Sequence, residues 1–161
     1  MTPFLSTTFC DDVRQEVGGK LSLIGVYNAV MYVPQFPVTL PKLWVLATYF
    51  MPQEEPPKDL KVRILKNTEP LADLDATPEY LQQLANLSEP VVTMPEGTQR
   101  VITSHMHVCF SPLVLDGPCM LRVVAITDKG DARGLGLQIQ QQAAPDALSV
   151  SQCVPGDSLS S

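Results

Sequence analysis

The 161 residues are enough for one domain, and a hydrophobic content of 45% with a mean hydropathy of +0.08 excludes a disordered chain. The net charge of −6 and the lack of a basic cluster disfavour direct binding to nucleic acid. No apolar run reaches the roughly 18 residues that a membrane-spanning helix needs.

The N-terminal stretch places polar residues between two strand-like apolar runs. We expect strands at Phe4–Phe9 and Leu21–Val33, with Gly18-Gly19 permitting the turn into the second. Asp11 and Asp12 could act as acid and base, yet neighbours on an extended chain point to opposite faces. Local hydrogen bonding of these carboxylates therefore explains them better than catalysis does.

This acidic stretch is followed by Gly19-Lys20-Leu21 and by Ile24-Gly25 in the second expected strand. Together these motifs resemble an uncharacterised family of small bacterial and phage proteins with a domain of unknown function. The resemblance covers the N-terminal third well and extends loosely to about Phe50. It implies a β fold and an accessory or host-interaction role, and it is silent about activity.

Further strands are expected at Leu43–Met51 and Leu60–Leu65. In the first of these both faces are largely apolar, which predicts a central or doubly covered strand. Trp44 and Tyr49 are therefore expected in the core, and Tyr49 is the partner-binding candidate if the outer face is instead an interface.

The central segment Asn67–Gln99 contains no Lys or Arg and carries six acidic residues, which account for the whole charge excess. We expect an excursion from the main fold with one helix at Pro78–Asn86, capped by Thr77. The segment is either a solvated connection or a docking surface for a basic partner. The partner-binding candidates in it are Glu69, Asp73, Asp75 and Glu79.

The C-terminal half predicts strands at Val101–Phe110, Met120–Thr127 and Gly134–Gln140, with a hairpin turn at Asp128–Asp131. From Ala143 onward the composition predicts a flexible tail. Alternation predicts one contiguous core that includes Leu60, Val62, Ile64, Leu121, Val123, Leu135, Leu137 and Ile139.

A column of polar residues is expected on one face of the strand Val101–Phe110. His105, His107 and Cys109 alternate there, and imidazole and thiolate are ligands that suit zinc or copper. A single strand supplies only two ligands easily, so we predict a polar strand face without metal and keep the metal site as the alternative.

These features predict an all-β protein, a single antiparallel β-sandwich of immunoglobulin-like or C2-like type, with about seven strands and one short helix. We expect a sandwich domain over residues 1–142, the excursion at 67–99 and the tail at 143–161. Four scattered cysteines and an N-terminus without a secretory signal predict a cytoplasmic protein with reduced thiols.

The function expected from the sequence is non-catalytic binding of a protein partner or of a second copy, because no complete catalytic template is present. We expect no catalytic residue, no cofactor, no membrane and no nucleic acid. The alternative is a metal-binding protein or enzyme that uses His105, His107 and Cys109.

Overall fold

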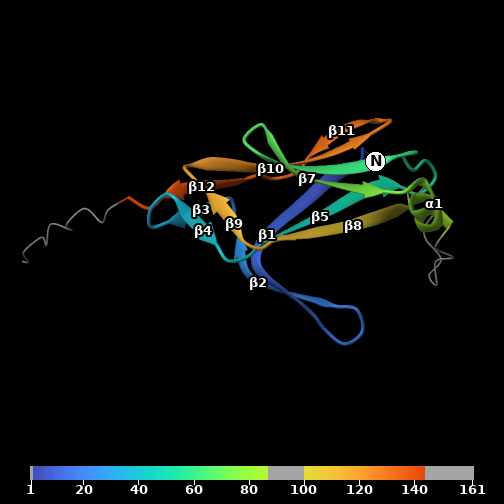
Figure 1. Ribbon diagram of the computed structural model, residues 1–161. Helices are drawn as coiled ribbons and strands as arrows, with labels where there is room; N and C mark the ends of the chain where they lie inside the picture. The colour runs from blue at the N-terminus through green and yellow to red at the C-terminus, as the bar shows by residue number, and fades with distance from the viewer. Residues whose placement is uncertain (1, 87–99, 144–161) are drawn as a thin grey trace, which may run out of the picture.

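The computed structural model describes residues 2–86 and 100–143, which form an all-β, sandwich-like fold with one short helix (Figure 1). The first layer is a four-stranded antiparallel sheet in the order β2-β1-β5-β8. Its strands are β1 (Phe4–Gln15), β2 (Leu21–Tyr27), β5 (Leu43–Pro52) and β8 (Val101–Phe110).

The second layer is a six-stranded sheet in the order β3-β12-β10-β6-β7, with β11 also paired to β10. All its pairs are antiparallel except β12 with β3. Its strands are β3 (Val30–Val33), β6 (Leu60–Lys66), β7 (Glu69–Ala76), β10 (Cys119–Thr127), β11 (Gly130–Arg133) and β12 (Leu137–Gln141). The short strands β4 (Val38–Leu40) and β9 (Leu113–Leu115) pair separately.

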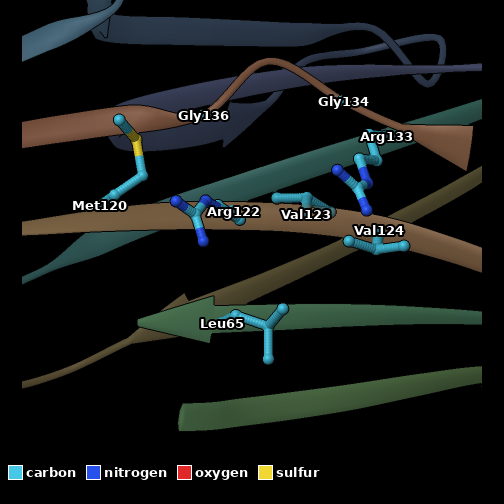
Figure 2. Close-up of a pocket in the computed structure, with 8 residues that line it drawn as sticks. All are labelled: Leu65, Met120, Arg122, Val123, Val124, Arg133, Gly134 and Gly136. Atoms are coloured by element: carbon cyan, nitrogen blue, oxygen red, sulfur yellow. The ribbon is translucent and has the colours of Figure 1, made fainter. Parts of the chain in front are cut away.

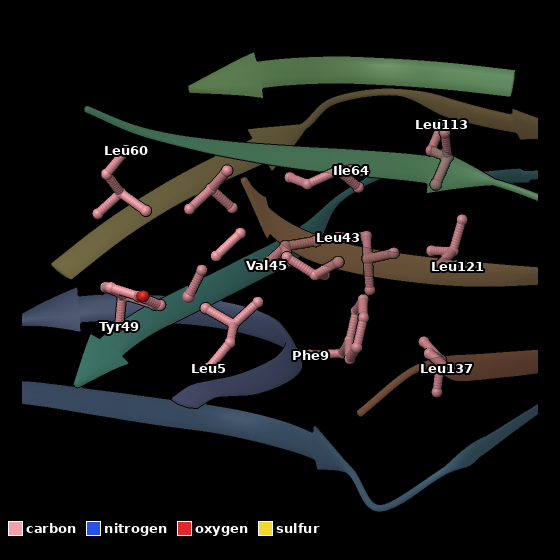
Figure 3. Packing of buried hydrophobic residues seen from close by; sticks show 14 of the residues in the cluster. Leu5, Phe9, Leu43, Val45, Tyr49, Leu60, Ile64, Leu113, Leu121 and Leu137 are labelled. Atoms are coloured by element: carbon pink, nitrogen blue, oxygen red, sulfur yellow. The ribbon is translucent and has the colours of Figure 1, made fainter. Parts of the chain in front are cut away.

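The core lies between the layers, where apolar side chains from both sheets meet (Figure 3). The alternation in β5 is complete: Leu43, Val45, Ala47, Tyr49 and Met51 are buried, and the residues between them are half-buried. The period-two pattern therefore decides which face of each strand is turned inward.

Seven of the eight predicted core residues belong to this one cluster, and Leu135 does not. Its side chain is 73% exposed, because β12 begins only at Leu137. The partner of β10 changes from β11 to β12 at this point, and Gly134–Gly136 has no residue-by-residue partner in the ladder, although it stays next to β10. The prediction of a strand over the whole of Gly134–Gln140 was therefore wrong for Gly134–Gly136, which precede β12.

The described residues contain twelve strands rather than about seven. The expected strand Leu21–Val33 is divided between the two sheets as β2 and β3. Short strands also form in segments assigned to connections, including β4, β9 and β11. Strands of three or four residues are too short to show a period-two pattern, so sequence patterning misses them.

The acidic segment differs from its prediction in its first half. Glu69–Ala76 is the strand β7 of the six-stranded sheet, not an excursion. The predicted helix is confirmed as α1 (Pro78–Asn86): Thr77 Oγ1 accepts a hydrogen bond from the Tyr80 backbone N–H at 3.2 Å, and Leu81 is buried. The rest of the segment, and the predicted tail from residue 144, lie outside the described residues.

No helix in the described parts of the chain is both long and apolar enough to cross a membrane.

Candidate functional site

The strand β1 pairs with a different neighbour along each of its two parts, and it has both neighbours only at Phe9 and Cys10. Phe4–Cys10 pairs with β5, whereas Phe9–Gln15 pairs with β2. Beyond Cys10 the chain continues as a two-stranded ribbon, which extends past both sheets in Figure 1. We call the segment Asp11–Tyr27 the ribbon. The sequence had placed the acidic motif in the connection between two strands. In the structure this motif lies on β1 itself.

Glycine permits the turn of the ribbon. Gly18 and Gly19 have φ values of +84° and +75°, a region that other residues rarely adopt. The Glu16 backbone N–H donates to the Lys20 carbonyl at 2.8 Å, and the Ser22 hydroxyl donates to the Glu16 carboxylate at 2.9 Å. This part of the motif is explained by folding alone.

Asp11 contacts β2 on one face of the ribbon. Its carboxylate accepts a hydrogen bond from the Tyr27 hydroxyl and lies directly over Gly25. A Cβ at Gly25 would lie 2.0 Å from Asp11 Oδ2, and Gly25 has a φ of +66°. The Ile-Gly motif is thus required by close packing of the acidic motif against the second strand.

Asp12 projects to the opposite face. Its carboxylate lies 2.9 Å from Lys42 Nζ and 3.9 Å from Arg14 Nε. The hydrogen bond from Lys42 lowers the pKa of Asp12 below its usual range. The two carboxylates therefore have separate partners and do not form an acid–base pair, as their positions on an extended chain predicted.

The ribbon exposes apolar side chains on both of its faces. Leu21 and Leu23 lie opposite Gln15 and Val13, whereas Ile24 and Val26 are on the face of Asp12. Five apolar side chains in the turn and in β2 are exposed: Val17 (96%), Leu21 (46%), Leu23 (37%), Ile24 (40%) and Val26 (50%). Single exposed apolar residues are ordinary, so the unusual feature is that five of them lie on one short ribbon, divided between its two faces.

The outer face of the four-stranded sheet continues this surface. The Phe4 and Phe50 rings stack with centroids 4.4 Å apart, and the Trp44 and His107 rings lie 5.8 Å apart. In the cross-strand register Val26 lies opposite Cys10, which lies opposite Trp44. The ribbon therefore continues the outer face of the sheet, although Cys10, which lies between Val26 and Trp44, is fully buried.

The predicted polar column on β8 is found on this outer face. His105 is held at both ring nitrogens, with Thr48 Oγ1 3.1 Å from Nδ1 and Thr103 Oγ1 3.1 Å from Nε2. Cys109 lies opposite Trp44 in the β5–β8 register. Within residues 2–86 and 100–143, no three His, Cys, Asp or Glu side chains are grouped to hold a metal ion.

Tyr49 is not on this surface. Its side chain is only 2% exposed and belongs to the core, and burial raises its pKa. The choice of Tyr49 as a partner-binding residue is therefore corrected. Trp44, Leu46, Thr48 and Phe50 occupy the outer face of β5 instead.

The predicted acidic surface is largely neutralised by the neighbouring strand. Asp73 forms two hydrogen bonds of 2.8 Å with Arg63 of β6. Asp75 lies 3.3 Å from Lys61, and Glu69 lies 3.4 Å from Lys66. The remaining candidate, Glu79, is in the first turn of α1. The charge pattern did not reveal these pairs because the basic residues precede the acidic segment in sequence.

A family model matches residues 5–140, which extends from β1 through the ribbon to β12. The chain belongs to DUF6941, a family of unknown function. Comparisons with curated proteins and with solved structures find no match. The DUF6941 match includes nearly all of both sheets and the whole of Asp11–Tyr27, so the ribbon is part of the family domain.

The contact between Tyr27 and Asp11 predicts a specific loss of stability at high pH. Burial and, secondarily, the hydrogen bond to Asp11 raise the pKa of Tyr27 to about 12. Because the folded state retains this proton more strongly than the unfolded state, the stabilisation is complete below about pH 10 and is lost as the pH rises to about 12. Urea denaturation across this range should show a shallower fall for Tyr27→Phe than for the wild type.

Tyr32→Phe is the matched control, because Tyr32 is 62% exposed. It should leave the fall in stability with pH unchanged. Identical pH profiles for the wild type and Tyr27→Phe would contradict the raised pKa.

Proposed function

We propose that this protein is a non-catalytic binding module that acts through protein–protein contact, and that the ribbon docks against the ribbon of a second copy. The observation that supports this is the group of five exposed apolar side chains on and next to the edge strand β2. The accessory or host-interaction role implied by the N-terminal motif is part of the same proposal.

Strand addition is the mode of contact that the ribbon favours. An edge strand presents backbone N–H and C=O groups that another strand can bind, and alternate side chains then add specificity. An isolated two-stranded ribbon is only marginally stable in water. A strand added beside β2 would cover Ile24 and Val26 on one face and Leu23 on the other.

Charge favours a second copy as the occupant. The ribbon carries Asp11, Asp12 and Glu16 against Arg14 and Lys20, and Lys42 is bound to Asp12. This region is therefore neutral, although the chain as a whole has a net charge of −6. Two copies repel each other least where their local charges balance.

Sedimentation of the full chain over a range of concentrations tests the proposal. We expect a dimer, and we expect the double variant Ile24→Lys, Val26→Lys to raise its dissociation constant about tenfold or more, since it introduces charges into an apolar contact. Leu135→Lys is the matched control, because Leu135 is exposed in the loop between β11 and β12 of the other sheet. It should leave the dimer unchanged.

A monomer at every concentration, or a dimer that the double variant does not weaken, would refute ribbon-mediated self-association. If the protein is a monomer, the partner that pairs with β2 would be a strand of another protein. The alternative of a metal protein rests on the shared face of His105, His107 and Cys109. One bound metal ion per chain, lost in a His105→Ala, His107→Ala variant, would favour that alternative.

A further inference from the structure

A hollow lies on the outer face of the six-stranded sheet, where the partner of β10 changes. β11 pairs with Val124–Thr127 and β12 with Cys119–Leu121, so the loop Gly134–Gly136 lies opposite Arg122 and Val123. The hollow has a volume of about 520 Å³. This is within the range of roughly 300–1,000 Å³ that small-molecule sites occupy.

Two arginines line this hollow. Figure 2 shows the Arg122 and Arg133 side chains on the same side of β10, with Leu65 and Val124 beside them. Arg133 lies opposite Val124 in the register, which makes it the diagonal neighbour of Arg122. Diagonal positions in an antiparallel pair are about 7–8 Å apart, so two long side chains there can reach one small ligand.

Neither arginine is neutralised by the protein. Within the described residues, no carboxylate lies within salt-bridge distance of Arg122 or Arg133. The other two basic residues of this face, Lys61 and Arg63, are bound to Asp73 and Asp75. The nearest acidic neighbour on β11, Asp131, also has no ion pair with Arg133. The hollow is therefore a local positive region in an acidic protein.

The walls of the hollow are held in place without a ligand. Arg122 Nη1 donates to the Asn67 carbonyl at 3.2 Å, and the Asn67 side chain accepts from the Met120 backbone N–H at 3.0 Å. On the opposite wall, the Thr7 hydroxyl donates to the Leu135 carbonyl at 2.6 Å, and the Gly134 backbone N–H donates to the Val123 carbonyl at 3.0 Å. A preformed site loses less entropy when it binds.

The glycines of the loop allow this close packing. A Cβ at Gly134 would lie 2.2 Å from the Thr7 side chain, and a Cβ at Gly136 would lie 2.8 Å from the Leu121 carbonyl oxygen. A larger residue would have to move away from Thr7 of β1 at the first position and from β10 at the second. The shape of the hollow therefore depends on these two positions.

From this geometry we infer that the hollow binds a small phosphate ester that carries an apolar or planar group. One guanidinium already saturates a carboxylate through two parallel hydrogen bonds, whereas a phosphate offers three acceptor oxygens and a larger charge to two arginines. Leu65, Val124 and the stem of Met120 provide an apolar floor for the rest of the ligand. This site is on the sheet opposite the ribbon and is independent of the proposed self-association.

Calorimetric titration of the full chain tests this inference with four probes: a purine nucleoside monophosphate, the same nucleoside without phosphate, inorganic phosphate and benzoate. We expect the nucleoside monophosphate to bind most tightly, inorganic phosphate to bind more weakly, and the nucleoside and benzoate to bind least. Arg133→Gln and Arg122→Gln should each weaken nucleotide binding about tenfold or more, because each removes a charge-assisted contact.

Arg100→Gln is the matched control. Arg100 is exposed, does not line the hollow and has no carboxylate at salt-bridge distance among the described residues. Its replacement removes the same charge and should leave the affinity unchanged. Arg133→Gln breaks no hydrogen bond of the described structure, so it keeps the test valid even if Arg122→Gln, which releases Asn67, folds poorly.

Three results would overturn the inference. The first is that no phosphate compound binds to the folded wild type at millimolar concentration. The second is binding of equal affinity in the wild type and Arg133→Gln, which would place the ligand elsewhere. The third is preferential binding of benzoate, which would assign the hollow to carboxylates.

Discussion

Leu137→Ala is expected to lower the free energy of unfolding by about 2–5 kcal/mol, because it removes a large buried side chain and leaves a cavity. Leu137 is fully buried in the core and lies opposite Leu121 in the six-stranded sheet. The side chains of Phe9 and Val45 reach into the same core from the four-stranded sheet (Figure 3). Urea denaturation measures the loss as a lower midpoint at an unchanged slope.

Leu135→Ala is the matched control for this prediction. Leu135 has the same chemistry two residues earlier, but it is 73% exposed. Its truncation should change the stability by about 0.5 kcal/mol or less. Equal midpoints for the two variants would contradict the position at which β12 begins.

The contrast between these two leucines shows how far sequence patterning reaches. Alternation correctly identified the inner faces of β6, β10 and β12, because a strand with one buried face must repeat every two residues. It failed at Leu135, because the apolar pattern continues through a loop. The end of a ladder depends on where β10 changes partner, which is a property of tertiary pairing.

Strand β7 was missed for a different reason. Its charged residues resemble those of a solvated connection, yet Asp73 and Asp75 face Arg63 and Lys61 across the ladder. Cross-strand pairs of opposite charge stabilise an edge strand even when its own sequence is rich in acidic residues. The basic partners lie in β6, before the acidic segment. A count of charges within Asn67–Gln99 therefore leaves them out.

The candidate sites were predicted only in part. The sequence indicated that the N-terminal motif matters. Only the structure shows why Gly25 is needed there, because Asp11 packs directly over it. The arginines of the hollow, Arg122 and Arg133, gave no sequence signal, since they lie on consecutive strands and only the register of the β10–β11 hairpin decides that they are neighbours. Sites made by strand pairing carry no fixed spacing, and sequence motifs do not reveal them.

Gly25→Ala should destabilise the protein by about 2–5 kcal/mol. A left-handed backbone costs a non-glycine residue about 1–2 kcal/mol, and overpacking typically adds about 1–3 kcal/mol. Both apply here, because Gly25 has a φ of +66° and its Cβ would lie 2.0 Å from Asp11 Oδ2. If the ribbon opens without global unfolding, the loss should be seen as faster hydrogen exchange of the β2 amides.

Two controls separate the strain of the backbone from the close approach of Asp11. Gly18 has a φ of +84°, but a Cβ added there would have nothing within 4 Å, so Gly18→Ala should cost only about 1–2 kcal/mol. In an Asp11→Ala background, which removes the two closest contacts, Gly25→Ala should cost about 1–3 kcal/mol less than in the wild type. An equal cost in both backgrounds would show that backbone strain alone requires glycine at this position. It would also leave the pairing of the Ile-Gly motif with the acidic motif without a physical basis.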